Sequence, residues 1–190
     1  MSGEEFMELI TKATVFAAKA HDGARRKGSG MPYILHPMEA ACIVSAMTRR
    51  SDLIAAALLH DVLEDTPVTY EQLKAEFGEK IADIVRMETE DKSKSWQERK
   101  GRTIEHLPLR DNGVKMVTLG DKLSNMRATY FDYRIIGDQI WQRFRVTDKR
   151  LHAWYYRGLL KGFESLRGLD AFAEFEELVL KVFGDVDPGI

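Results

Sequence analysis

The chain has 190 residues, of which 44% are hydrophobic and 31% charged, and its formal net charge is −2. This composition is typical of a globular protein with one sizeable core, and the nearly neutral charge argues against general nucleic-acid binding. No apolar run is long enough to predict a transmembrane helix, and the first residues lack the basic and apolar regions of a signal peptide. With one cysteine, Cys42, an internal disulfide is excluded, which suits a reducing cytoplasm.

The chain opens with a helical pattern. Ser2 and Glu5 have the spacing of a capping box, and apolar residues then recur at helical spacing until about residues 21–23. A loop rich in glycine and basic residues follows over residues 23–37. We therefore expect one helix and then an exposed, positively charged connection.

A second helix is predicted after this loop. Pro37 suits its first turn, and the apolar pattern continues to about Thr48. Cys42 lies within this pattern, so we expect its thiol in the core.

The central prediction is one helix over residues 51–66, capped by Ser51, whose apolar run leads directly into ionisable residues. These residues are His60, Asp61, Glu64 and Asp65. Residues four apart share a helix face, so His60 is expected one turn before Glu64 on one face, and Asp61 one turn before Asp65 on the next. A buried helix that ends in such groups must satisfy them, and metal coordination would do so with nitrogen and oxygen ligands.

The remainder adds helices and no persuasive strand. The predicted helices cover residues 69–78, 79–88, 95–107, 111–126, 139–144, 148–166 and 169–183. Residues 90–95 read as an exposed loop and residues 185–190 as a frayed tail. Glycine and proline fall at joints rather than in long linkers. The sequence thus predicts one all-α domain over residues 1–190, with about nine or ten helices.

Four residues on three segments form a candidate metal set: His36, His60, Asp61 and Asp121. Considered alone, such residues have alternatives to a role as metal ligand. His36 could form hydrogen bonds within a loop, His60 could be a hydrogen-bonded core histidine, and Asp121 could face solvent. Together they offer imidazole and carboxylate ligands with positions left for water. A metal with open positions lowers the pKa of bound water and polarises a phosphoryl oxygen.

Two further acids, Glu64 and Asp65, are candidates for catalysis. Beside a cation they could hold a water and accept its proton. The alternative is that they merely end the helix, but acids at a helix C-terminus oppose the macrodipole, so local stability does not explain them.

Candidate substrate-binding residues lie both before and after the central helix in the sequence. Arg26 and Lys27 belong to the glycine-rich loop and could clamp phosphates, although a solvated basic loop is the alternative. Tyr33 could stack on a base or pack in the protein. Asn125 lies one helical turn after Asp121 and is expected to face the same way.

These residues fall into five ordered blocks. They are His21-x-Gly-x-x-Arg26-Lys27, Pro32-Tyr33-Ile-x-His36-Pro37, Ala56-Ala-Leu-Leu-His60-Asp61-x-x-Glu64-Asp65-Thr66, Phe77-Gly78 and Asp121-Lys122-Leu-x-Asn125. Over roughly residues 10–130 the chain resembles HD-domain phosphohydrolases, in particular the hydrolase domain of RelA/SpoT proteins and the small alarmone hydrolases. It departs at Ala24, where many relatives carry Gln, and at Gly120, where Ala is usual and where glycine would slightly loosen the helix.

The resemblance implies an HD-domain helical bundle and a metal-dependent hydrolase. The substrate would be guanosine 3′,5′-bis(diphosphate) (ppGpp) or its pentaphosphate, alarmones of the stringent response. A metal-bound water would release pyrophosphate and leave GDP or GTP. The implied roles are one divalent ion, usually Mn²⁺, on His36, His60, Asp61 and Asp121, water activation by Glu64 and Asp65, and substrate binding by Arg26, Lys27 and Asn125. The alternatives are an HD phosphohydrolase of another nucleotide and a non-catalytic nucleotide-binding HD module.

Several residues stay outside this scheme. His106 and His152 match no ligand of the family, which favours one metal over two. Four aromatic residues in the last third are expected in the core or at a dimer contact: Trp141, Trp154, Tyr155 and Tyr156. The expected partner is a small nucleotide, with no nucleic acid and no membrane, and a homo-oligomer stays open.

Overall fold

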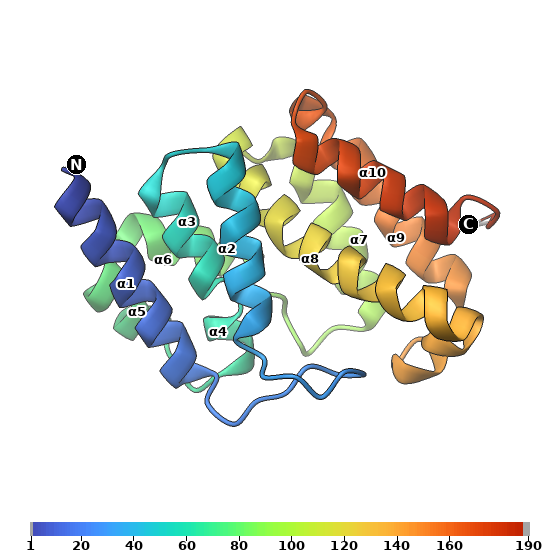
Figure 1. Ribbon diagram of the computed structural model, residues 1–190, viewed down its shortest axis with the longest axis horizontal. Helices are drawn as coiled ribbons and strands as arrows, with labels where there is room; N and C mark the ends of the chain where they lie inside the picture. The colour runs from blue at the N-terminus through green and yellow to red at the C-terminus, as the bar shows by residue number, and fades with distance from the viewer. Residues whose placement is uncertain (1, 188–190) are drawn as a thin grey trace. The chain divides into compact units, whose positions relative to one another are not determined.

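The protein is described here by a computed structural model that covers residues 2–187 (Figure 1). Within these residues the chain forms ten α-helices and no strand, and its only β-type pairing is an isolated bridge between Arg25 and Pro32. The prediction of an all-α helical bundle is confirmed. The helices are α1 (Gly3–Ala20), α2 (Leu35–Met47), α3 (Ser51–Leu59), α4 (Val62–Asp65), α5 (Tyr70–Phe77), α6 (Glu79–Glu88), α7 (Trp96–His106), α8 (Asn112–Ile136), α9 (Lys149–Gly162) and α10 (Asp170–Phe183).

Two compact units make up the fold. The first comprises Met1–Glu90 and Met116–Asp121, and the second comprises Asp91–Lys115 and Lys122–Ile190, each considered within the described part of the chain. Helix α8 contributes residues to both units.

The first unit is centred on α3. Every residue of α3 except Asp52 is buried, as expected for a helix that is apolar on all sides. It packs against α1, α2 and α6, and α5 packs on α6. Small side chains at residues 55–57 allow these helices to approach closely. The C-terminal residues of α3 are thereby buried, which matters because His60 follows them directly.

The second unit contains an aromatic core. Helix α9 packs against α7 and α10, and Trp141, Tyr155 and Tyr156 are buried there, as predicted, whereas Trp154 is half-buried. His152 stacks on Trp141 with ring centroids 5.0 Å apart and donates from Nε2 to the Val146 carbonyl at 2.8 Å. His152 is therefore a satisfied core histidine.

The predicted central helix is wrong in one respect, because it is interrupted at His60 and Asp61. Helix α3 ends at Leu59, and α4 begins at Val62 with Asp61 as its N-cap. The backbone N–H groups of Glu64 and Asp65 both donate to the Asp61 carbonyl, at 3.2 and 2.9 Å. Since α4 has only four residues, the argument from the dipole of one long helix loses its basis.

Other boundaries also shift. Arg50 rather than Ser51 is the N-cap of α3. Residues 139–144 fall largely in a 3₁₀ helix, η2 (Gly137–Arg143). The helix predicted over residues 148–166 ends at Gly162, before the 3₁₀ turn η3 (Glu164–Leu166). Of the tail, residues 185–187 are not helical, and residues 188–190 lie outside the described residues.

The prediction that the Cys42 thiol lies in the core is wrong. Its thiol is exposed, although Ala40, Ala41, Ile43 and Val44 around it are buried. The pattern of α2 is apolar on nearly every side, so the spacing could not show which residue faces outward.

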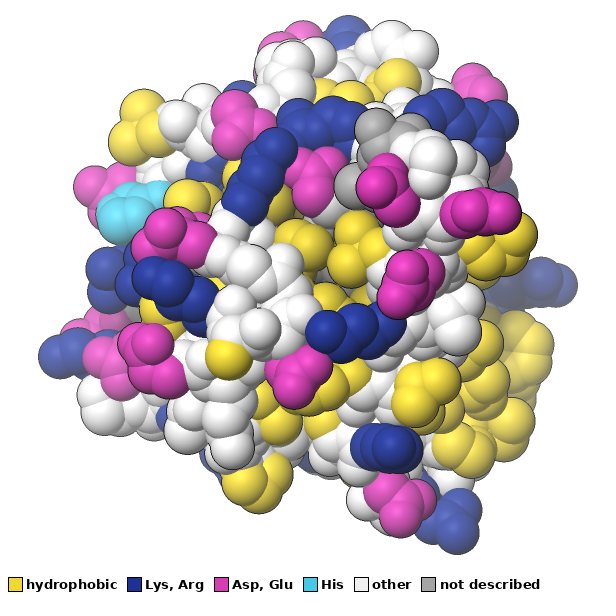
Figure 2. Space-filling model, turned by 90° about the vertical axis from the view of Figure 1, so that its left-hand side faces the viewer, with side chains coloured by type: hydrophobic (Ala, Val, Ile, Leu, Met, Phe, Trp, Pro, Cys, Tyr) yellow, Lys and Arg dark blue, Asp and Glu magenta, His cyan; other side chains and the backbone are white. Residues whose placement is uncertain are grey.

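The surface is mixed in character. Figure 2 shows one face on which acidic, basic and hydrophobic side chains are interspersed. Among the described helices, none combines the length and the apolar content needed to cross a bilayer.

Asp52 anchors the start of α3 to its neighbours. Its carboxylate pairs with Arg50 at 2.7 Å and with Lys80 of α6 at 2.8 Å. Burial acts to raise the pKa of Asp52, but the hydrogen bonds from Arg50 and Lys80 outweigh it and lower the pKa to about 2. The folded state therefore prefers the ionised carboxylate.

We expect Asp52→Asn to lower the free energy of unfolding by about 1 kcal/mol near pH 7, since ion pairs that water reaches are worth less than the pKa shift implies. A lowered folded pKa gives stability that is present above the unfolded value, 3.8, and is lost as the pH falls toward about 2. Urea denaturation of both proteins at several pH values checks this. A difference that stays constant down to about pH 3 would contradict the assignment.

Candidate metal centre

Four side chains of the first unit converge at the ends of its helices. His36 lies in the first turn of α2, His60 and Asp61 lie in the turn between α3 and α4, and Asp121 comes from α8. The imidazoles of His36 and His60 and the carboxylate of Asp121 are buried. These are the four residues that the sequence selected as candidate ligands.

The ligand atoms lie close to one another. His36 Nε2 is 3.2 Å from Asp121 Oδ1 and 3.2 Å from His60 Nε2. Asp61 Oδ2 is 2.9 Å from His60 Nε2 and 3.6 Å from His36 Nε2. His36, His60 and Asp121 each offer an atom within 4.8 Å of the other two, and Asp61 joins them through its contacts with both imidazoles.

These separations fit ligands around one ion. Two ligands about 2.1 Å from a shared metal are separated by roughly 3.0 to 3.4 Å in octahedral or tetrahedral geometry. The contacts among the four side chains bracket this range. Mixed nitrogen and oxygen donors suit a divalent transition metal. The cluster therefore suggests a divalent metal site.

A backbone contact orients the His60 ring. Its Nδ1 lies 2.8 Å from the Ala57 carbonyl, and because a carbonyl can only accept, Nδ1 carries the proton. Nε2, which faces His36 and Asp61, is then the atom that presents a lone pair when the ring is neutral. This is the arrangement that metal-binding histidines use to fix their tautomer. The contact also satisfies a carbonyl near the C-terminus of α3.

The electrostatics of the cluster favour cation binding. Burial lowers the pKa of His36, so its imidazole is neutral. Burial acts likewise on His60, but the carboxylates of Asp61 and Asp121 outweigh it and raise the pKa of His60. Burial would raise the pKa of Asp61, yet the neighbouring His60 keeps it below its usual value. A positive charge is thus already stabilised at this point, and a metal would displace the His60 proton.

Gly120 brings Asp121 close to His36. A Cβ at Gly120 would lie 2.7 Å from Val44 Cγ2 and 2.9 Å from the Ala40 carbonyl of α2. Both distances are shorter than van der Waals contact, so only glycine allows α8 to approach α2 this closely. Since His36 lies one turn before Ala40 on α2, the glycine's main effect is a close helix contact rather than a looser helix.

We expect Gly120→Ala to weaken metal binding about tenfold or more, because the α2 backbone must move away from Asp121, and to cost about 1–3 kcal/mol of stability by overpacking. Titration with Mn²⁺ by calorimetry, together with urea denaturation, measures both. Gly101→Ala in α7 is the control, since a Cβ there meets only Trp154 at 3.7 Å, an ordinary contact. Equal metal affinity in both variants would contradict this role for Gly120.

The Tyr33 hydroxyl contacts two of the acids. Its hydroxyl donates to Asp61 Oδ2 at 2.6 Å and lies 3.4 Å from Asp65 Oδ2. Burial, and then the charge of Asp61, raises the pKa of Tyr33, so the hydroxyl keeps its proton. Tyr33 therefore orients Asp61 and links it to Asp65, a role that the sequence did not indicate.

Glu64 is held from the other side. Its Oε2 accepts from the backbone N–H of Glu90 at 3.0 Å, just after α6. Burial raises the pKa of Glu64, and the charges of Glu90, Asp61 and Asp65 raise it further, against a lowering by the Glu90 N–H. Glu64 is half-buried and Asp65 is exposed. A fixed carboxylate with a raised pKa is suited to accept a proton from water.

His21 is a residue whose position the sequence did not explain. It is buried, its ring centroid lies 5.0 Å from that of Tyr33, and its Nε2 has no hydrogen-bond partner. Burial lowers the pKa of His21, so the ring is neutral. Its signal in the sequence was its place at the start of the first motif block, where it packs behind Tyr33.

The predicted substrate residues are placed as follows. Arg26 is half-buried and Lys27 exposed in a hairpin-like loop, where Arg26 N–H donates to the Met31 carbonyl at 2.8 Å and Gly30 N–H to the Arg26 carbonyl at 3.0 Å. Asn125 lies on α8 one turn after Asp121, and its carbonyl accepts from Thr129. The loop thus has a defined backbone that carries three cations, Arg25 among them.

The sequence and the fold are similar to those of known proteins. Residues 13–134 match the profile of the HD domain. The guanosine-3′,5′-bis(diphosphate) 3′-pyrophosphohydrolase MESH1 of Danio rerio is 38% identical over 169 residues, which are 87% of this chain and 88% of that protein. The bifunctional (p)ppGpp synthase/hydrolase SpoT of Escherichia coli K12 is 35% identical over 66% of this chain, which spans 18% of SpoT.

A solved structure is also similar to this chain. The structure of a metazoan ortholog of SpoT that hydrolyses ppGpp matches this chain with a TM-score of 0.71 and 29% sequence identity. The match covers 95% of this chain and 97% of that one. The chain belongs to the HD-domain family.

Proposed function

We propose that the chain is a metal-dependent phosphohydrolase that converts guanosine 3′,5′-bis(diphosphate) or its pentaphosphate to GDP or GTP and pyrophosphate. The observation that carries the proposal is the cluster of two imidazoles and two carboxylates, in which each carboxylate lies within 3.6 Å of both imidazoles, beside a half-buried glutamate. The similarity to proteins named for this hydrolysis supports the choice of substrate.

In this proposal one divalent ion, Mn²⁺ in particular, is held by His36, His60, Asp61 and Asp121. Their donor set and the His60 tautomer support the assignment. When bound, such an ion lowers the pKa of water and polarises a phosphoryl oxygen.

The chain's own acids would direct the water. Glu64, fixed by the Glu90 N–H, accepts a proton as the water attacks the phosphorus bound to the ribose O3′. Asp65, which Tyr33 links to Asp61, holds the water in line. The bond between phosphorus and O3′ breaks, O3′ takes up a proton to become a hydroxyl, and pyrophosphate leaves.

Arg26, Lys27 and Asn125 would bind the substrate. The loop that carries Arg26 and Lys27 has a backbone defined by hydrogen bonds, and the charges of these two side chains suit phosphates. Asn125 shares α8 with Asp121. We further propose that residues 1–190 act as one HD phosphohydrolase domain in the cytoplasm, on nucleotides rather than nucleic acid. The family match across residues 13–134, which include parts of both units, supports a single domain.

A nucleotide panel tests the proposal. The purified chain with Mn²⁺ is incubated with ppGpp, pppGpp, deoxynucleoside triphosphates and other phosphorylated nucleotides, and products are resolved by anion-exchange chromatography. We expect pyrophosphate in equal amount to GDP or GTP, from the first two only. Preferred hydrolysis of another nucleotide would replace the substrate, and metal uptake without hydrolysis of any member would indicate a binding module.

A further inference from the structure

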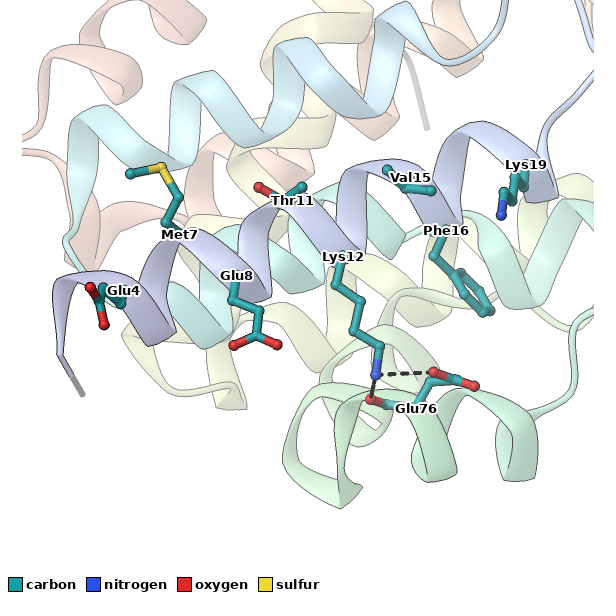
Figure 3. A pocket seen from close by; sticks show the side chains of 9 residues that line it. All are labelled: Glu4, Met7, Glu8, Thr11, Lys12, Val15, Phe16, Lys19 and Glu76. Carbon is teal, nitrogen blue, oxygen red and sulfur yellow. Dashed lines mark hydrogen bonds and ion pairs between the residues drawn. The ribbon is translucent and has the colours of Figure 1, made fainter.

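The outer face of α1 carries apolar side chains that the first unit does not use. Ala13 and Ala17 of α1 are buried, whereas Met7 is 69% exposed and Val15 is 48% exposed. Figure 3 shows Met7, Thr11 and Val15 in one row along the helix. Their spacing of four residues places them on a single stripe.

A shallow groove of about 740 Å³ follows this stripe, with Glu76 of α5 on its far side. One exposed apolar residue is ordinary on a protein surface, but a stripe that borders a groove is typical of a contact surface. Lys12 reaches away from the stripe to α5, where its Nζ donates to the Glu76 carbonyl at 2.6 Å and pairs with the Glu76 carboxylate at 3.0 Å.

Charge is distributed unevenly along the same face. Glu4 and Glu8 lie toward the N-terminal end, and Lys12 and Lys19 toward the C-terminal end. Because Glu76 neutralises Lys12, the face runs from negative at Glu4 and Glu8 to positive at Lys19. The helix macrodipole accounts for Glu4 in the first turn and Lys19 in the last, but not for Glu8 in the interior or for the apolar stripe.

We propose that this face binds a second copy of the chain, with the two α1 helices packed antiparallel about a two-fold axis at Thr11. In this register Met7 of each copy meets Val15 of the other, and the two Thr11 side chains face each other. Each negative end then lies against the partner's Lys19. The sign of the charge reverses about Thr11, so the surface complementary to this face is the same face turned around, which is the condition for a two-fold contact.

The contact is small. Two 18-residue helices bury at most roughly 1,000 Å² together, at the lower end of specific interfaces, so the dimer dissociates on dilution. The proposal uses only α1 and its groove and does not depend on the proposed hydrolysis.

Sedimentation equilibrium of the full chain over a wide concentration range tests the association. We expect a reversible monomer–dimer equilibrium that Val15→Asp weakens at least about tenfold, since a carboxylate would be buried against Met7. Leu109→Asp is the matched control, because Leu109 is an exposed apolar residue outside α1, and it leaves the equilibrium unchanged. A monomer at every concentration up to about millimolar would overturn the proposal.

Charge exchange tests the register. Lys19→Glu makes both ends of the face acidic, and Glu4→Lys with Glu8→Lys makes both ends basic, so neither variant dimerises alone. Mixed together they form a heterodimer, and one chain with all three changes recovers the homodimer. A dimer that persists in both single-sign variants would show that α1 does not form the contact.

A crosslink locates the axis. In a Cys42→Ser background, Thr11→Cys is expected to form an intermolecular disulfide under mild oxidation, because the two Thr11 positions meet at the axis. The Cys42→Ser parent is the control. A chain that stays uncrosslinked while dimeric would place the axis elsewhere, and a monomeric chain that hydrolyses ppGpp would overturn this inference alone.

Discussion

Replacing Glu64 by Gln is expected to leave the divalent metal bound and to reduce turnover by about 10²- to 10⁴-fold, the contribution of a positioned general base. In the parent protein the Glu90 N–H donates a hydrogen bond to Glu64 Oε2 at 3.0 Å. The amide of Gln keeps an oxygen that can accept this hydrogen bond, so the local structure should be preserved. What the amide cannot do is take a proton from water. Rates of pyrophosphate release, with the metal content of the same samples, measure the two effects separately.

Glu79→Gln is the control for this change, since Glu79 is an exposed carboxylate paired with Lys74. It should retain both metal and rate. A Glu64→Gln protein that hydrolyses at the parent rate would assign the proton acceptor elsewhere, and Asp65 would be the next residue to test.

Replacing Asp121 by Ala is expected to abolish metal retention, with a loss of affinity greater than about a hundredfold, because changes in residues that only support a ligand already cost 10- to 100-fold. Asp121 is the member of the cluster that comes from α8, and His36 Nε2 lies 3.2 Å from it. Without it, His36 and His60 face each other across a site that has lost one of its two negative charges. Elemental analysis after gel filtration, at a stated excess of Mn²⁺, gives the bound metal per chain.

Asp132→Ala is matched to this change, since Asp132 is another aspartate of α8 but pairs with Arg143. It should keep its metal. If Asp121→Ala retained metal as well as Asp132→Ala does, the ion would have to be held without α8, and the proposed ligand set would be wrong.

The two variants and Gly120→Ala separate three functions. Glu64→Gln should lose rate with metal bound, Asp121→Ala should lose metal and therefore rate, and Gly120→Ala should lose metal affinity in proportion to the displacement of α2. An excess of Mn²⁺ should restore the rate of the Gly120→Ala variant, because this variant keeps all four candidate ligands and Glu64. The same excess should not restore the rate of the Glu64→Gln variant.

Local signals predicted the start of several helices, although Arg50 rather than the predicted Ser51 caps α3. The capping box predicted at Ser2 forms, the helix predicted from residue 69 begins with a capping box at Thr69, and Asp111 caps α8 through the N–H groups of Gly113 and Val114. Such bonds join residues two or three apart, so the sequence contains all of their partners. The same holds for the apolar run of α3, which is buried on all sides.

Predictions that needed the direction of a side chain did less well. The face of Cys42 and the break at His60 were missed, because both depend on neighbours distant in sequence. For Tyr33 the sequence suggested stacking on a base or packing in the protein, and it did not indicate the hydrogen bond to Asp61. That bond could not be predicted locally, because Asp61 lies 28 residues away.

The sequence by itself determined the class of fold and the candidate ligands, because helix caps, apolar periodicity and the types of ionisable residue are all local properties. The tertiary structure decided how the candidate ligands meet. Gly120 permits α8 to approach α2, the interrupted helix turns His60 and Asp61 toward His36, and Tyr33 and Glu90 hold the acids. These contacts depend on the packing of helices that are far apart along the chain, and helical periodicity contains no information about which helices will touch or how closely.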